Sequence, residues 1–337
     1  MSQISPQKTP ISSSQSPDTK PNFLKKLASW LYAFWKFSRP HTVVGTTLSI
    51  LGLSLIAIAT PSTGSSLSIP PVAEGFAFPV GSVFLTLLAC LAGNVYIVGL
   101  NQLEDVEIDQ INKPHLPLAS GEFSRRQGWA IVAIAGLLAL AVSLTQGRFL
   151  AATVCLSLLI GTAYSLPPIR LKRFPVWASL CIFSVRGLIV NLGLFLHLQE
   201  KLGSLPYIPP TVWTLTLFIL VYTWAIALLK DIPDLEGDRL YHISTFALRL
   251  GQRTVFNLTR GVLILCYVGM MVAGLVISTL NPFILIPTHL LALLALWLQS
   301  RRVDFAKKST LTRFYQFIWK LFFLEYLMFP LACFFRS

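Results

Sequence analysis

The acidic residues of this chain are concentrated in two short windows. Of its 14 Asp and Glu residues, four lie in residues 101–109 (NQLEDVEID) and four in residues 230–238 (KDIPDLEGD). In each window, oxygen-bearing side chains recur three or four residues apart, which would place them on one face of a helix. These side chains are Asn101, Asp105, Asp109, Asp231, Asp234 and Asp238. Pro233 and Gly237 interrupt the second window, so part of it is expected to be a loop or a helix restart.

Carboxylates grouped this closely repel one another, and a bound cation would stabilise them. Neither window contains His or Cys, so the ligands are hard oxygens, which favour Mg²⁺ or Mn²⁺ over Zn²⁺. Mg²⁺ commonly shares its coordination shell with substrate phosphates. Two windows that face one another would therefore hold a diphosphate through metal ions. A solvated acidic loop would explain the charge, but not the spacing or its occurrence twice.

Basic side chains accompany both windows and could bind the oxygens of a diphosphate. The candidates are Lys113, Arg170, Lys172, Lys230 and Arg239. The alternative reading of the basic loop at residues 170–173 is a topology signal alone. Arg186 lies within an apolar run, with Asn191 one turn further on. Because an intramembrane Arg usually faces a cavity or a partner, this pair is a candidate contact for a polar acceptor.

The elements that must position these residues are membrane-spanning helices. The chain is 54% hydrophobic and only 12% charged, with a mean hydropathy of +0.66, whereas soluble domains carry about 25% charged residues. Several apolar runs approach or reach the ~20 residues that a transmembrane helix needs. We predict nine spans, at residues 48–59 (extending back to 42), 80–100, 129–145, 149–164, 177–198, 212–229, 255–280, 282–298 and 314–335.

The net charge of +13 could suggest nucleic-acid binding, but the basic residues are distributed along the chain as expected for a membrane topology. Basic residues precede the first span and recur in every second connection, while the intervening connections hold only Arg148 and Lys201. Because cytoplasmic loops are enriched in Lys and Arg, this alternation predicts a cytoplasmic N-terminus and a C-terminus on the opposite side.

Two segments precede the first span. Residues 1–22 are rich in Ser, Pro, Gln and Thr, which predicts a disordered tail, with a plastid transit peptide as the rival reading and a bacterial source favoured. Residues 23–37 are amphipathic and suit a helix that lies on the membrane surface. The rest of the chain, residues 23–337, is predicted to form one transmembrane domain.

The two windows are also followed by similar features. Gly121 comes 12 residues after Asp109, and Gly251 comes 13 residues after Asp238; an Arg and the next span follow each glycine. This similarity predicts an internal duplication in which each half contributes one acidic motif.

Three segments carry a family resemblance: NQLEDVEIDQINKPHLPLASGE, YSLPPIRLKR and KDIPDLEGDRLYHISTFALRLG. They resemble the first motif, the connecting loop and the second motif of the UbiA superfamily of intramembrane aromatic prenyltransferases, over about residues 30–335. The first motif reads Asn-Gln where many members have Asn-Asp, so one acid of that pattern is absent. The resemblance implies an all-α bundle of nine transmembrane helices around a central cavity, with both acidic motifs at its cytoplasmic mouth.

Within the superfamily, the segments FSRPHT, NKPHLPLASGE and ISTFA are most similar to the homogentisate prenyltransferases of tocopherol synthesis. This implies two Mg²⁺ ions on a prenyl diphosphate, phytyl diphosphate by preference, and transfer to homogentisate with loss of carbon dioxide. Lys113, Arg170 and Lys172 would take up charge on the diphosphate, and the ring of Tyr164 would stabilise the allylic cation. Arg39 and His41 would join Arg186 and Asn191 around the acceptor.

Several alternatives stay open at this point. Geranylgeranyl or solanesyl diphosphate could be the donor, and another aromatic ring could be the acceptor. A secondary transporter would also have internal repeats and buried acids, although its acids would lie near the bilayer midplane. If the source is photosynthetic, both a plasma and a thylakoid membrane would be possible.

Overall fold

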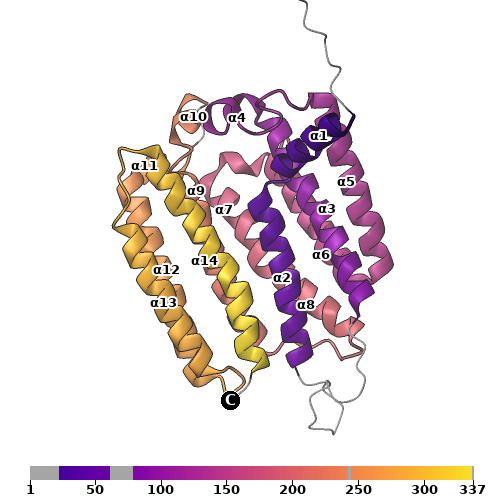
Figure 1. Ribbon diagram of the computed structural model, residues 1–337, viewed down its shortest axis with the longest axis vertical. Helices are drawn as coiled ribbons and strands as arrows, with labels where there is room; N and C mark the ends of the chain where they lie inside the picture. Colours follow the sequence, from indigo (N-terminus) through magenta and orange to yellow (C-terminus); the bar gives the residue numbers. More distant parts are fainter. Residues whose placement is uncertain (1–22, 61–78, 242–243, 336–337) are drawn as a thin grey trace, which may run out of the picture.

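The computed structural model describes residues 23–60, 79–241 and 244–335, and these residues form helices joined by turns and short loops. The predicted tail at residues 1–22 lies outside the described residues. Long helices run side by side in one bundle, and short helices gather at one of its ends (Figure 1).

Nine spans in the described ranges are long and apolar enough to cross a membrane, which confirms the number predicted from the sequence. The first four are α2 (Pro40–Ala59), α3 (Val80–Glu104), α5 (Arg125–Gln146) and α6 (Arg148–Ser165). The fifth combines α7 (Pro175–Phe183), η3 (Ser184–Ile189) and α8 (Val190–Lys201). The last four are α9 (Pro210–Lys230), α12 (Gln252–Val276), α13 (Pro282–Ser300) and α14 (Lys308–Phe334).

Most of these helices extend beyond the apolar runs that predict them. The run at residues 80–100 continues to Glu104, and the run at 314–335 begins at Lys308. Apolar composition identifies only the part of a helix that lies in hydrocarbon, because backbone hydrogen bonding continues through a polar terminal turn. The polar ends matter here, since the first acidic motif begins in the last turn of α3.

The bundle has its apolar side chains on the outside as well as in the core. Ile134 and Leu137 on α5 and Leu275 on α12 are each at least 66% exposed. Conversely, the polar side chains of Gln102 and Asn191 are buried. A surface of this kind needs a hydrocarbon environment, as expected for a membrane bundle.

Short helices cover one end of the bundle. They are α1 (Phe23–Phe37), α4 (Val106–Asn112), η2 (Leu171–Arg173), α10 (Leu235–Leu240) and α11 (Phe246–Leu250). In Figure 1, α1, α4, α10 and α11 lie at this end, and α14 finishes at the other. Contacts between α4 and α10 bring together segments that are about 125 residues apart in sequence.

The α1 helix has the form predicted for residues 23–37. Only Ala33 and Phe37 are buried, while Phe23, Trp30 and Trp35 leave large apolar surfaces exposed. Its position on a membrane surface remains a prediction that follows from this exposed face.

The predicted duplication has a counterpart in the backbone. After α4 the chain reaches Gly121 at φ +80°, and after α10 and α11 it reaches Gly251 at φ +83°. Both values lie in the region that favours glycine, and a long helix follows each. Each acidic motif is therefore followed by a glycine with positive φ before the next long helix begins.

Candidate functional site

The first acidic motif lies where α3 gives way to α4. The long helix ends at Glu104, Asp105 takes a non-helical conformation, and α4 begins at Val106. The break is slight, because the Asp109 amide still donates to the Asp105 carbonyl at 2.7 Å. Asn101, Asp105 and Asp109 consequently line a common pocket, although the helix is not continuous.

The second motif lies where α9 gives way to α10. The α9 helix ends at Lys230, Pro233 prevents its continuation, and α10 restarts at Leu235 after Asp234. Asp231, Asp234 and Asp238 all line the same pocket as the first motif. The structure thus brings together all six predicted metal ligands at one end of the bundle.

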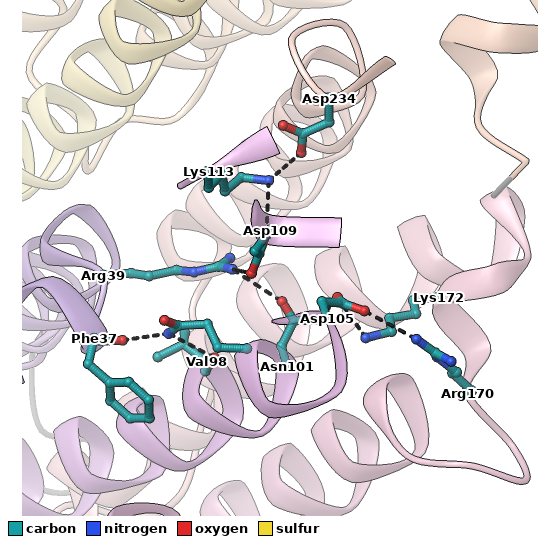
Figure 2. A network of polar contacts seen from close by, with 11 residues as sticks. Phe37, Arg39, Val98, Asn101, Asp105, Asp109, Lys113, Arg170, Lys172 and Asp234 are labelled. Atoms are coloured by element: carbon teal, nitrogen blue, oxygen red, sulfur yellow. Dashed lines mark hydrogen bonds and ion pairs between the residues drawn. The ribbon is translucent and has the colours of Figure 1, made fainter. Parts of the chain in front are cut away.

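Two contacts join the motifs directly. Lys113 Nζ lies 2.6 Å from Asp234 Oδ2 and 3.9 Å from Asp109 Oδ1, so one ammonium bridges an acid from each half (Figure 2). The Gly237 amide also donates to Asn112 Oδ1 at 3.0 Å. A Cβ at Gly237 would lie 2.6 Å from the Asn112 amide group, so this close approach requires glycine.

Sequence reasoning missed the positioning role of Asn112. Its only signal is its place beside Lys113 after the acidic window, which does not distinguish it from a turn residue. Ser244 and Thr245 also line the pocket and were not predicted.

Other cations engage the first motif. Arg170 and Lys172 lie 3.2 Å and 2.8 Å from the two oxygens of Asp105 (Figure 2). Arg39 donates to Asn101 Oδ1 at 3.2 Å and lies 4.0 Å from Asp109. Asp105 and Asp109 therefore each have a cation within reach, as expected for a site that must also bind an anion.

Burial controls the charge of these acids. It raises the pKa of Asp231 to about 6 and that of Asp238 to about 7. It also raises the pKa of Asp109, against the opposing effect of Arg39 and Lys113. Asp109 Oδ2 is buried and accepts no hydrogen bond from any described residue. The pocket therefore holds carboxylates that would bind a further cation.

Within the part of the chain that the structure describes, no three His, Cys, Asp or Glu side chains lie close enough to enclose a metal ion by themselves. An ion bound here would complete its coordination with water or with oxygens of a ligand. That behaviour is typical of Mg²⁺, which keeps several waters and rarely occupies an all-protein cage.

The missing acid of the first motif has a structural explanation. Gln102 is buried, and its amide donates to the carbonyls of Phe37 at 2.8 Å and Val98 at 3.2 Å. It does not line the acidic pocket. Glutamine at this position therefore joins the end of α1 to α3. Because the side chain points outside the lining, an acid at position 102 would not be needed among the ligands of the pocket.

The acidic pocket adjoins a mainly apolar cavity of about 270 Å³. The acidic pocket has a volume of about 90 Å³, and the two spaces share six lining residues. These are Arg39, Asn101, Tyr164, Ile182, Ala227 and Lys230. The arrangement suits a ligand with an anionic head and an apolar tail.

The predicted acceptor and diphosphate residues are not all in these spaces. His41 and Arg186 line the apolar cavity, and Arg39 lines both spaces. Asn191 is buried outside both linings, where it accepts a hydrogen bond from Tyr326 at 2.7 Å. Arg239, next to Asp238 on the short α10 helix, is exposed and lines neither space. Arg170 also lines neither space, although it pairs with Asp105 at 3.2 Å. Three of the predicted contacts, Asn191, Arg239 and Arg170, therefore lie outside the two linings.

The bundle and the site define a class: a membrane-embedded enzyme with an acidic pocket at the mouth of an apolar cavity. The acids lie at span ends and not in mid-membrane, which disfavours a transporter. Residues 71–321 match the model of the UbiA prenyltransferase family. The chain belongs to this family, as its motifs predicted.

Relatives and solved structures support the same assignment. The chain is 52% identical to homogentisate phytyltransferase from Synechocystis sp., over 90% of this chain and 96% of that protein. It is 39% identical to homogentisate phytyltransferase 1, chloroplastic, from Arabidopsis thaliana, over 91% and 76% of the two chains. A UbiA homolog from Archaeoglobus fulgidus, solved with GPP and Mg²⁺, has the same fold, with a TM-score of 0.58 and 16% identity, over 90% and 99% of the two chains.

Proposed function

We propose that this prenyltransferase transfers phytyl from phytyl diphosphate to homogentisate, with loss of carbon dioxide, to give 2-methyl-6-phytyl-1,4-benzoquinol. The observation that carries the proposal is the meeting of both acidic motifs at a pocket that opens into an apolar cavity. The 52% identity to a homogentisate phytyltransferase over nearly the whole chain supports this choice of substrates.

The acidic pocket fits two Mg²⁺ ions bound together with the diphosphate. Its donors are hard oxygens, and Asp109 has an oxygen that accepts no hydrogen bond from the described residues. No group of carboxylates among those residues encloses a metal ion by itself. The six side chains that would hold the ions are Asn101, Asp105, Asp109, Asp231, Asp234 and Asp238. Bound Mg²⁺ would neutralise the charge that develops on the departing diphosphate.

Cations in the pocket, together with Arg170 beside Asp105, bind and stabilise the diphosphate. Lys113, Arg170 and Lys172 each touch an acid of the motifs and would turn toward phosphate oxygens when a ligand separates those pairs. Lys230 lines both spaces and lies where the head of the donor would meet its tail.

The chemistry then takes place where the two spaces join. The allylic C–O bond breaks, and its electron pair leaves with the diphosphate. The resulting carbocation lies beside Tyr164, whose ring face would stabilise it, and the apolar cavity wall excludes water. The ring of homogentisate forms the new C–C bond and loses a proton. The carboxyl group leaves as carbon dioxide, and a proton replaces it to complete the methyl group.

The charge pattern supports an orientation in the membrane. We infer that the end bearing α4 and α10 faces the cytoplasm, since the basic connections gather at that end. The start of α1 would then be cytoplasmic, and the end of α14 would lie on the other side. The Synechocystis relative supports a bacterial source. The plasma membrane and the thylakoid membrane both stay open as the location.

An assay of membranes with labelled homogentisate and a panel of prenyl diphosphates tests the proposal. We expect phytylated quinol that disappears with EDTA and returns with Mg²⁺. Asp105→Ala and Asp234→Ala should abolish turnover without preventing insertion. Glu107→Ala is the matched control, since Glu107 belongs to the same motif but pairs with Arg125 outside the pocket. Ion flux in liposomes without any prenylated product would refute the proposal.

A further inference from the structure

Arg186 lies inside the membrane-spanning part of the bundle and has no acidic partner among the residues that the structure describes. It lines the apolar cavity, and its guanidinium lies 5.0 Å from the ring centroid of Trp319 and 5.7 Å from that of Phe322. No Asp or Glu of the described residues lies within ion-pair distance of it. Because an intramembrane charge is costly, a guanidinium that faces a cavity without a counter-ion indicates an anionic ligand.

The backbone around Arg186 is shaped to hold it there. The fifth span changes to a π-helical turn at Ser184–Ile189, a feature that often occurs at functional sites. Gly187 packs so closely on α9 that a Cβ would lie 2.6 Å from the Leu220 Cα atom. On the other side, a Cβ at Gly45 of α2 would lie 3.2 Å from Arg186 Nη1. The guanidinium thus lies between α2 and the rings of α14.

The other cations of the cavity also belong to the acidic pocket. Arg39 donates to Asn101 and lies near Asp109, and Lys230 lines both spaces. Of the Lys and Arg residues that line the apolar cavity, Arg186 alone does not line the acidic pocket. It is therefore placed for an anionic group that is distinct from the diphosphate.

Aromatic groups surround this position. The His41 and Trp319 rings meet edge to face with centroids 4.9 Å apart, and both line the cavity. Tyr326 also lines it and is oriented by its hydrogen bond to Asn191. A flat ring could lie against these faces while an acidic arm reaches Arg186.

We propose that Arg186 binds the carboxylate of the aromatic acceptor, and that Trp319 and His41 form the wall against which the acceptor ring lies. This inference rests on the proposed function and adds the recognition of the acceptor. It also gives Asn191 an indirect role, since Asn191 orients Tyr326 and does not contact the acceptor.

Steady-state kinetics of purified protein in lipid would test the assignment. Arg186→Gln should raise the KM for homogentisate about 10- to 100-fold, as expected for a lost hydrogen-bonded ion pair. The KM for phytyl diphosphate should stay within about twofold. Arg186→Lys should be intermediate, because it keeps the charge but loses the planar fork. With methylhydroquinone, which lacks the carboxylate, wild type and variant should have similar KM values.

Arg260→Gln is the matched control. Arg260 also lies against a ring, 5.7 Å from the centroid of Phe256, but it does not line the cavity, so its replacement should leave both KM values unchanged. Unchanged KM for homogentisate in Arg186→Lys and Arg186→Gln would overturn the assignment, as would a raised KM for phytyl diphosphate. If Arg186→Gln fails to insert, Arg186→Lys decides alone. An inactive wild type would instead refute the proposed function, and this inference with it.

Discussion

Replacing Lys113 with Met should strengthen the binding of Mg²⁺ to the acidic pocket and weaken the stabilisation of the leaving diphosphate. The ammonium lies 2.6 Å from Asp234 and 3.9 Å from Asp109, so it neutralises acids that metal ions would otherwise bind. Without it, Mg²⁺ should bind the free protein more tightly, whereas the leaving diphosphate loses a donor. A residue with only a structural role would not produce this opposition.

The size of the first effect follows from the burial of the pair. The Lys113 side chain is 28% exposed and that of Asp234 is 9% exposed. Breaking an exposed pair costs about 0–1 kcal/mol and breaking a fully buried one about 3–5 kcal/mol, so about 2 kcal/mol is expected here. Since 1.4 kcal/mol corresponds to a factor of ten, Mg²⁺ affinity should rise about 30-fold. Turnover should fall about 10²- to 10³-fold, as for the loss of one donor to a developing anion.

Calorimetric titration of Mg²⁺ without diphosphate measures the first effect, and single-turnover prenyl transfer measures the second. Arg125→Met is the control, because Arg125 pairs with Glu107 at the same end of the bundle but outside the pocket. Weaker or unchanged Mg²⁺ binding in Lys113→Met, or turnover equal to wild type, would refute the reasoning.

Three further predictions concern the pH dependence of the acidic pocket, the buried pair of Glu325 and His289, and the buried Gln102. Because burial raises the pKa of Asp231 to about 6 and that of Asp238 to about 7, Mg²⁺ titrations should show affinity falling below about pH 7. In the metal-free protein the native state then binds more protons than the unfolded chain, so the free energy of unfolding should fall as pH rises from about 4 to 7. Glu325→Ala removes the carboxylate that lies 3.2 Å from His289 Nε2, in a pair whose side chains are at most 3% exposed. It should lower the free energy of unfolding by about 3–5 kcal/mol in denaturant titrations, and a double replacement by apolar residues should restore most of this loss. Gln102→Asp should lower stability by about 1–3 kcal/mol without changing Mg²⁺ affinity in the same titrations, because it removes two buried donors and adds no ligand to the pocket.

The membrane spans could be predicted because their cause is local. A run of apolar residues must lie in hydrocarbon, and a helix is the form that satisfies its backbone there. The weakest run, residues 149–164, still corresponds to α6. The ends of the helices were less predictable. The last turn of α3 is polar, so apolar composition does not show that it is helical, and its conformation depends on the segments packed around it.

The candidate site could be predicted only in part. The spacing of Asp105 and Asp109 selected them correctly as residues of one pocket. The same kind of reasoning put Arg239 beside the diphosphate and Asn191 beside the acceptor, and the structure places neither in the lining. Sequence proximity does not determine the direction of a side chain where the helix has just restarted, nor where a π-helical turn changes its rotation.

The sequence alone determined the number of spans, the acidic character of the site and the family. These properties depend on composition, spacing and motifs that can be read along the chain. Only the tertiary structure decided that Lys113 bridges to Asp234 and that Asn112 accepts from the Gly237 amide. It also decided that Arg186 faces the cavity with no acidic partner in the described part of the chain. Each of these contacts joins segments far apart in the chain or depends on the rotation of a helix, and both are set by the packing of the whole bundle.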